Sequence, residues 1–191
     1  MNVGVIGAMQ VELEYLLDHL EHTKEEKYGT TVFVTKVNEN NVYIVQCGIG
    51  KVNASIATSI LAIEYKCDLI INTGIAGGTY PLQTRDVILG KNIGYHDVNV
   101  TQFGYPYGQI PGMPDSFSSH PHDLELVKNA LGRMSIEYKE ANIYTGDQFV
   151  SSLEQLRNVN DEGFACEMEG AAVAHTASKL GVGFVVLRFI S

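Results

Sequence analysis

The chain has 191 residues, of which 45% are hydrophobic, and its formal net charge is −9. A chain of this length and composition buries a sizeable core as one domain without disulfide or metal staples, which excludes wholesale disorder. The acidic balance, with Lys and Arg scattered along the chain, argues against binding to nucleic acid or to an anionic membrane surface.

In the first half of the chain, apolar strands alternate with amphipathic helices and end in glycine-rich turns. The apolar runs are continuous, which is typical of strands buried on both faces, and the first helix has leucines at helical spacing. In chain order we expect a strand at 2–6, a helix at 10–20, a hairpin of strands 30–37 and 41–47, a helix from 48–51 to about residue 65, and a strand at 67–72.

The second half continues this alternation around one long loop. Residues 103–119 hold three of the five prolines and several aromatic residues, and a long ordered loop inside a compact domain is often functional. In order we expect strand material at 86–90 and from 95, a helix at 123–131, a strand at 140–144, a short helix at 153–159, a helix opened by 166–170 that ends near residue 180, and a last strand at 183–189.

This order predicts a single α/β domain over residues 1–191, a three-layer α/β/α sandwich around a central mixed, mostly parallel sheet. In such folds ligands bind at the carboxyl ends of the strands, where glycine turns are expected at 7–9, 48–50 and 74–78. Tight strand-to-helix turns need the same residues, but three such turns favour a shared crevice. None matches GxGxxG or a Walker A loop, which disfavours a dinucleotide or nucleoside triphosphate.

The cysteines and the N-terminus bear on the cellular setting. Cys47, Cys67 and Cys166 are far apart among apolar or small residues, so we expect reduced, buried thiols, and no Cys or His spacing indicates a metal site. The N-terminus does not resemble a signal peptide, and no apolar run has the length of a membrane span. We therefore expect a cytoplasmic protein.

Two groups of carboxylates are candidates for chemistry. Glu12 lies in the first turn of the first helix, where the helix N-terminus stabilises an ionised carboxylate that can accept a proton, but Glu14 is an equal rival on periodicity. Glu167 and Glu169 flank Met168 ahead of a run of small residues. One of these carboxylates can accept both hydroxyls of a ribose diol, although the pair also fits plain pairing with a helix dipole.

The remaining titratable groups have simpler interpretations. We expect four histidines to be structural or loop residues: His96, His120, His122 and His175. His96 and its neighbour Asp97 lie on a strand and therefore point to opposite faces, which argues against a catalytic pair. Arg188 is a cation inside the last apolar strand, so we expect it to have an acidic partner.

Taken together, several motifs in order along the chain carry a resemblance to a known family. They are residues 4–9 with Glu12, 48–52, 70–74 with 76–78, 95–97, 103–112, 146–149, 167–169 and 188–191. As a set they resemble the 5′-methylthioadenosine/S-adenosylhomocysteine nucleosidase family, within the nucleoside phosphorylase-like fold. The set covers the whole chain and is specific, whereas no single motif is.

The resemblance implies hydrolysis of the N-glycosidic bond of 5′-methylthioadenosine and S-adenosylhomocysteine, releasing adenine and the thioribose product without a metal or cofactor. Glu12 would activate the water, Glu169 would hold the ribose diol beside Met168, and Phe149 would stack on adenine. Carboxylates near the sugar suit the oxocarbenium-like transition state of this reaction. The other implied substrate-binding residues are Ile49, Ala76, Gly77, Val150 and Glu167, with Phe103 and Pro111 covering the neighbouring site in a homodimer.

The chain departs from the family pattern at two places. Ile75 stands where many members have Ser, which alters the water site. The family continues from Arg-x-Ile-Ser into Asp, the acid that protonates adenine, and into a last helix, whereas this sequence stops at Ser191. We therefore expect a chain without the family's C-terminal helix that hydrolyses substrate roughly 10²–10⁴-fold more slowly, for want of the acid.

Two other functions remain open on the sequence. A purine nucleoside phosphorylase of the same fold needs converging Arg or Lys side chains for phosphate, and none of Arg85, Arg133, Arg157 and Arg188 lies in a glycine turn. A non-catalytic nucleoside-binding protein is the alternative if the general acid is absent.

Overall fold

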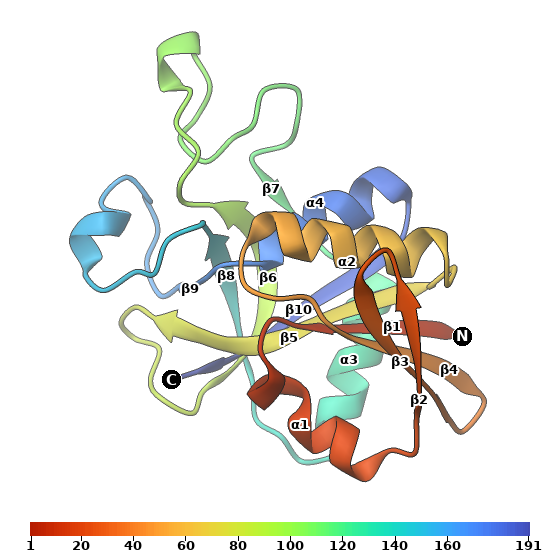
Figure 1. Ribbon diagram of the computed structural model, residues 1–191. Coiled ribbons are helices and arrows are strands. Elements are labelled where there is room, and N and C mark those ends of the chain that lie inside the picture. Colours follow the sequence, from red (N-terminus) through yellow and green to blue (C-terminus); the bar gives the residue numbers. More distant parts are fainter.

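Four strands form the parallel centre of the sheet. In the computed structural model, which describes residues 1–191, β4 (Asn40–Gln46), β1 (Asn2–Gly7), β5 (Leu69–Gly78) and β10 (Gly183–Ile190) lie side by side in that order (Figure 1). All four run in the same direction, so their carboxyl ends meet at one edge of the sheet. The glycine-rich segments 7–9, 48–50 and 74–78 meet at this edge as predicted, although residues 74–78 belong to β5 rather than to a turn.

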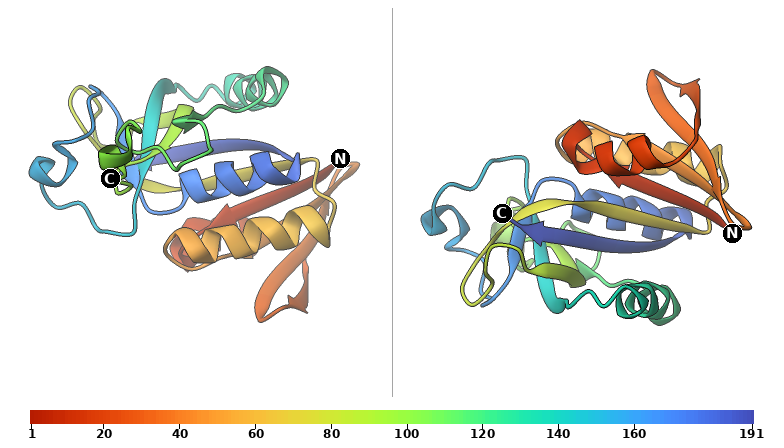
Figure 2. Two further views of the ribbon diagram at one scale, coloured as in Figure 1. Left: turned by 90° about the horizontal axis from the view of Figure 1, so that it is seen from above. Right: turned by 90° about the horizontal axis from the view of Figure 1, so that it is seen from below.

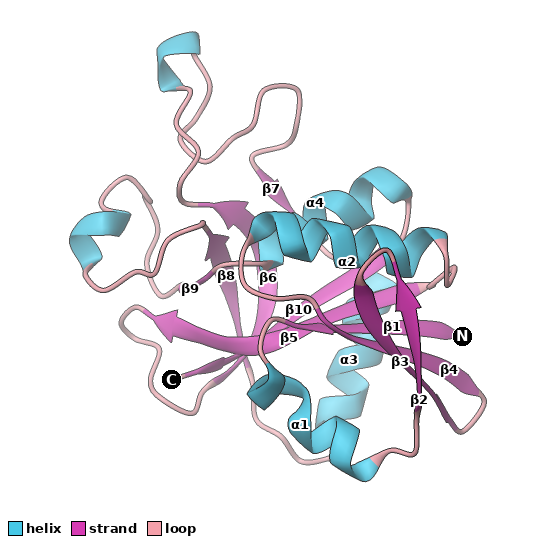
Figure 3. Ribbon diagram, in the orientation of Figure 1, coloured by secondary structure: helices cyan, strands magenta, loops and turns pink.

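Helices cover both faces of this centre. α2 (Lys51–Ile63) and α4 (Gly170–Leu180) pack together above the strands in Figure 1, and α1 (Gln10–His19) and α3 (Pro121–Arg133) lie below them. Figures 2 and 3 show the strands enclosed between these helices. The predicted α/β class and layering are therefore confirmed. None of the helices has the length and hydropathy needed to cross a bilayer.

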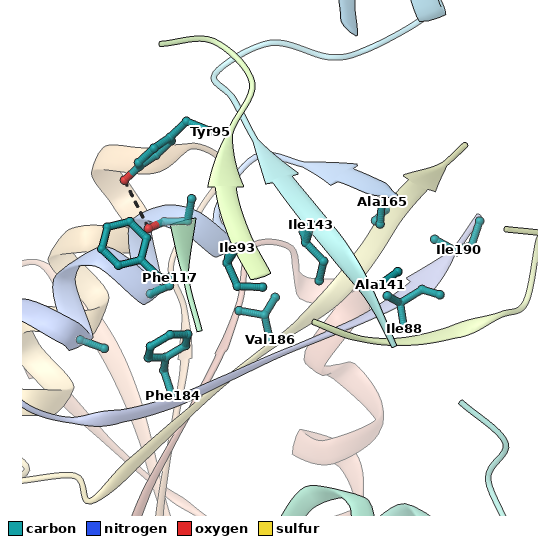
Figure 4. Packing of buried hydrophobic residues seen from close by; sticks show 14 residues of the cluster. Ile88, Ile93, Tyr95, Phe117, Ala141, Ile143, Ala165, Phe184, Val186 and Ile190 are labelled. Carbon is teal, nitrogen blue, oxygen red and sulfur yellow. Dashed lines mark hydrogen bonds between the residues drawn. The ribbon is translucent and has the colours of Figure 1, made fainter. Parts of the chain in front are cut away.

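The sheet closes on itself beyond its parallel centre. β6 (Val87–Tyr95), β8 (Lys139–Thr145) and β9 (Ala165–Glu167) continue it, and because β10 pairs with both β5 and β6 while β9 pairs with both β8 and β5, five strands form a ring. Side chains fill the ring, and Figure 4 shows Ile93, Ile143 and Val186 pointing toward one another inside it. The sheet is mixed, as predicted: β6–β8 and β8–β9 are parallel like the centre, whereas the ring pairs β10–β6 and β5–β9 and the edge strands are antiparallel.

Several boundaries differ from the sequence prediction. β5 continues through the glycine turn expected at 74–78, because β10 and β9 pair with it there. Residues 165–167 form β9, so the helix expected from 166 begins at Gly170. Three further elements were not predicted: β2 (Thr23–Lys27), which pairs with β3 (Thr30–Val37), and the short helix η1 (Thr101–Phe103) and β7 (Ser116–Phe117) near the two ends of the long loop. A fourth, the short helix η2 (Leu153–Leu156), is shorter than predicted.

Candidate active site

A cavity of about 430 Å³ opens at the carboxyl ends of the strands. Its wall is contributed by the segments that follow β1, β4, β8 and β10, by the last residues of β5, and by the segment from β9 to α4. The lining residues are Ala8, Met9, Glu12, Ile49, Ile75, Ala76, Gly77, Gln148, Phe149, Val150, Cys166, Glu167, Met168, Glu169 and Ser191. Nine of these fifteen residues are hydrophobic, so the cavity suits a largely apolar ligand with a few polar anchor points.

Glu12 is held in this cavity by three backbone N–H groups. Its Oε2 accepts hydrogen bonds from Ala8 at 2.8 Å and Met9 at 2.9 Å, and its Oε1 accepts one from Ile75 at 3.0 Å. The carboxylate also explains why residue 74 is glycine, because a Cβ at Gly74 would collide with it. The alternative that periodicity left open is thereby resolved: Glu14 is exposed and does not line the cavity, whereas Glu12 does.

Glu169 is a second carboxylate in the same cavity. It is only 7% exposed, and its Oε1 accepts a hydrogen bond from the Gly50 N–H at 2.8 Å. Burial, and then the neighbouring Glu167 carboxylate, raises the pKa of Glu169 to about 7. Because the folded chain keeps this proton up to about pH 7, the contribution of this group to stability falls as pH rises from its ordinary pKa of 4.5 through that value.

Glu167, predicted as a substrate-binding residue, lies in the cavity wall. Its carboxylate is fully engaged inside the protein: it forms a salt bridge with Arg188, accepts from the Thr145 hydroxyl, and accepts from the N–H groups of Glu169 at 3.0 Å and Gly170 at 2.8 Å. Burial alone would raise the pKa of Glu167, but Arg188 and these hydrogen bonds outweigh it and hold the pKa below its usual value. Glu167 lines the cavity wall and accepts the Glu169 N–H, and a contact with substrate stays a prediction.

Arg188 has the acidic partner that its place in an apolar strand required. It is 1% exposed, and besides Glu167 it donates to the side-chain and backbone oxygens of Asn72, the latter at 3.1 Å. Asn72 and Thr145 were missed by sequence reasoning. Their signal was a polar residue at the end of an apolar strand, a place where a buried hydrogen-bond partner is required.

The predicted substrate-binding residues Ile49, Ala76, Phe149 and Val150 all line the cavity. Phe149 is 82% exposed, Ile49 is half-exposed and Ala76 is buried. Met168, which the resemblance places against the sugar, also lines the cavity. Met9, Gln148, Cys166 and Ser191 complete the wall and were not in the predicted set.

Phe103 and Pro111 do not line the cavity of their own chain. They belong to the segment between β6 and β7, which rises away from the sheet at the top of Figure 1. Phe103 is 70% exposed, and Pro111 is exposed as well.

The other polar candidates are structural. His175 stacks on Phe117 and shares a hydrogen bond with the Tyr95 hydroxyl at 3.1 Å, while Asp97 pairs with Lys51 rather than with His96. The three cysteines are free; Cys67 is buried, and Cys47 and Cys166 are half-buried rather than fully buried as expected. Burial raises the pKa of Cys166 to about 11, so this cavity thiol stays protonated at neutral pH. No group of three or more His, Cys, Asp or Glu side chains is placed to hold a metal ion.

Comparisons with known proteins agree with this geometry. A model of the phosphorylase superfamily matches residues 2–191. A Staphylococcus aureus 5′-methylthioadenosine/S-adenosylhomocysteine nucleosidase is 39% identical over 194 residues, a match that covers 99% of this chain and 85% of that protein.

Solved structures give the same assignment. The Streptococcus pyogenes S-adenosylhomocysteine nucleosidase in complex with 5-methylthiotubericidin has a TM-score of 0.93 at 34% identity, covering 100% of this chain and 83% of that one. The corresponding enzyme of Colwellia psychrerythraea, in complex with adenine, has a TM-score of 0.93 at 37% identity, covering 100% and 82%. The chain therefore belongs to the 5′-methylthioadenosine/S-adenosylhomocysteine nucleosidase family of the phosphorylase superfamily.

Proposed function

We propose that the chain hydrolyses the N-glycosidic bond of 5′-methylthioadenosine and S-adenosylhomocysteine, releasing adenine and the thioribose product. The observation that carries this proposal is the pair of carboxylates, Glu12 and Glu169, in one largely apolar cavity. Relatives in the same family are named for this reaction, and their structures hold adenine or a thionucleoside analogue. We place the activity in the cytoplasm, in methionine salvage and purine nucleoside catabolism.

The proposed mechanism assigns one task to each side of the cavity. Glu12, fixed by three N–H groups, takes a proton from water, and the water attacks the anomeric carbon as the bond to adenine breaks. Ionised Glu169 accepts the ribose hydroxyls and stabilises the positive charge that develops on the sugar. Adenine stacks on Phe149 between Ala76 and Val150, while Met168 packs against the ribose.

The family resemblance assigns the proton donor for adenine to the residue after Ser191. Ser191 itself lines the cavity, and its N–H donates to the Ala76 carbonyl at 3.1 Å. A side chain that follows Ser191 would therefore start beside the proposed adenine pocket. This placement supports the assignment of the adenine side of the cavity.

Hydrolysis is favoured over phosphorolysis by the charges of the cavity. No Lys or Arg lines it, and Arg188, which contacts the wall residue Glu167, is buried in the pair with it. A phosphate co-substrate needs such donors. Water is therefore the better-supported nucleophile.

Incubation of the chain with methylthioadenosine in phosphate-free buffer should release adenine, measured by chromatography. Added phosphate should leave the rate unchanged, and no ribose 1-phosphate product should form. Strict dependence on phosphate would instead assign the chain as a phosphorylase. Tight binding of adenine without any release of adenine from methylthioadenosine would assign a non-catalytic nucleoside-binding protein.

The pH dependence of the same assay tests the role of Glu169. Only the ionised carboxylate accepts two hydroxyls, so kcat/KM should rise as pH increases through about 7, the value to which burial raises the pKa of Glu169. Glu169→Gln should lower kcat/KM and remove this rise. A profile that is unchanged in the Gln variant would assign the titration to another group.

The proposed assembly is a homodimer in which Phe103 and Pro111 cover the partner's cavity. Phe103 is 70% exposed, and α2 presents Val52 and Ile56, which are 70% and 46% exposed, beside the half-exposed Ile49 of the cavity wall. Exposed apolar side chains grouped near a site are typical of an interface. Sedimentation velocity is the direct check, and a monomer at assay concentrations would contradict this assembly.

A further inference from the structure

Behind the cavity wall, one cation and two carboxylates join three loops. Lys51 Nζ lies 2.7 Å from Asp97 Oδ2 and 3.7 Å from Asp147 Oδ2. The three residues come from the segments that follow β4, β6 and β8. The side chains of Lys51 and Asp97 are 24% and 22% exposed, so this pair is more shielded from water than an ordinary surface ion pair.

The N-terminus of α2 is capped by carboxylates from elsewhere in the chain. Gly50, the residue before the helix, has no side chain to cap it and has φ 99°, a conformation that favours glycine. Its N–H donates to Glu169, and the next N–H, that of Lys51, donates to Asp147 Oδ1 at 2.8 Å. The carboxylates of Glu169, the proposed ribose ligand, and of Asp147 thus accept adjacent N–H groups at the N-terminus of α2.

The same loop carries the proposed adenine platform. Asp147 is two residues from Phe149, and its own N–H donates to Asp97 Oδ2 at 2.8 Å. Just before it, Gly146 packs so closely on the buried His96 ring that a Cβ would lie 2.6 Å from Nε2. Beyond it, the backbone of residues 148–150 has one hydrogen bond, which the Phe149 carbonyl accepts from Gln155 Nε2 at 3.3 Å, and Gln155 Oε1 accepts from the N–H groups of Ser151 and Ser152. Phe149 is therefore held by Asp147 on its N-terminal side and by Gln155 on its C-terminal side.

We infer that Lys51 and Asp97 are positioning residues that lock Asp147, and through it hold the adenine platform at a fixed spacing from the ribose carboxylate. Neither lines the cavity, so neither touches the substrate. The Lys51 ammonium lies between the carboxylates of Asp97 and Asp147, which would otherwise be close together without a cation. Asp97 also accepts the Asp147 N–H and thereby orients the loop that carries Phe149. The substrate named here rests on the proposed function, but the lock itself rests only on these contacts.

Kinetics of Lys51→Met are the first test. Without the lock, substrate binding must order the loop, so KM for methylthioadenosine should rise about ten- to thirtyfold while kcat changes less than about threefold. Lys51→Arg keeps the cation and should recover most of the affinity. Lys128→Met is the matched control, because Lys128 is 27% exposed and lies 2.6 Å from Glu140, remote from the cavity, and it should leave KM unchanged.

Hydrogen–deuterium exchange of the intact protein is the second test and needs no activity. Amides of residues 147–158 should exchange faster in Lys51→Met than in wild type, Lys51→Arg or Lys128→Met. Unchanged exchange there, or equal changes in Lys51→Met and Lys128→Met, would overturn the inference, as would a kcat loss with constant KM. If wild type releases no adenine, the proposed function fails while the exchange result still decides the lock.

Discussion

Replacing Glu12 with Gln is expected to lower kcat/KM for methylthioadenosine by about 10³-fold, within the range that a general base supplies. Both oxygens of Glu12 accept backbone N–H groups, from Ala8 and Met9 on one side and from Ile75 on the other. In Gln, one oxygen becomes an NH₂ group that must face one of these donors. The variant therefore loses the base and part of its anchoring together.

Glu14→Gln is the matched control for this change. Glu14 lies two residues away on the same helix, is exposed, and was the equal rival on periodicity. Its replacement should leave kcat/KM within about twofold of wild type. Adenine binding, measured by calorimetry, should survive in Glu12→Gln because the adenine side of the cavity is untouched. A Glu12→Gln enzyme of near-wild-type rate would remove Glu12 as the base.

The comparison of Glu12 with Glu14 shows where sequence reasoning stops. Glu12 lies in the first turn of the correctly predicted helix α1 and Glu14 just beyond it, and helical spacing alone does not say which one faces β5. That choice depends on the packing of Leu13, which is fully buried, and on the space above Gly74. Long-range packing of this kind leaves no local signal, although the glycine at residue 74 was a correct pointer to a crevice.

The roles of Glu167 and Glu169 also depend on long-range contacts that the sequence pattern does not contain. Their spacing suggested a functional pair, and the requirement for an acidic partner of Arg188 was correct, but these two observations were not joined. The partner proved to be Glu167, which β9 brings next to β10 across the closed ring. Ring closure depends on β9, a three-residue strand whose pairing no periodicity predicts. The edge strand β2 was missed because its residues are Thr, Lys and Glu rather than apolar.

The buried pair carries the largest expected effect on stability. Arg188 and Glu167 have side chains that are 1% and 3% exposed, and Arg188→Met leaves the Glu167 carboxylate in the core without its cation. Removal of one partner of a buried pair costs about 3–5 kcal/mol. For a chain of this size that corresponds to a fall in Tm of roughly 6–20 °C, measured by calorimetry.

Two further variants test whether the loss of stability in Arg188→Met comes from the buried position of the pair rather than from the loss of an ion pair in general. Lys139→Met removes a pair with Asp86 whose Lys is 50% exposed, and it should cost about 1 kcal/mol or less. The double variant Arg188→Met/Glu167→Met should be more stable than Arg188→Met, because it removes the uncompensated charge. A Tm of Arg188→Met equal to that of Lys139→Met would contradict the buried pair as described.

The stability of Arg188→Met should also depend on pH in a different way from that of wild type. Arg188 holds the pKa of Glu167 below its usual value, so the pair stabilises the fold above that usual value and loses its contribution as pH falls. Arg188→Met removes the main cause that lowers this pKa, while the hydrogen bonds from Thr145, Glu169 and Gly170 remain, so the pKa of Glu167 rises relative to wild type. The variant should therefore gain stability relative to wild type as the medium is acidified. The Glu167 carboxylate also accepts the Glu169 N–H and so helps to position the proposed ribose ligand. Near neutral pH, Arg188→Met should therefore be both less active and less stable than wild type.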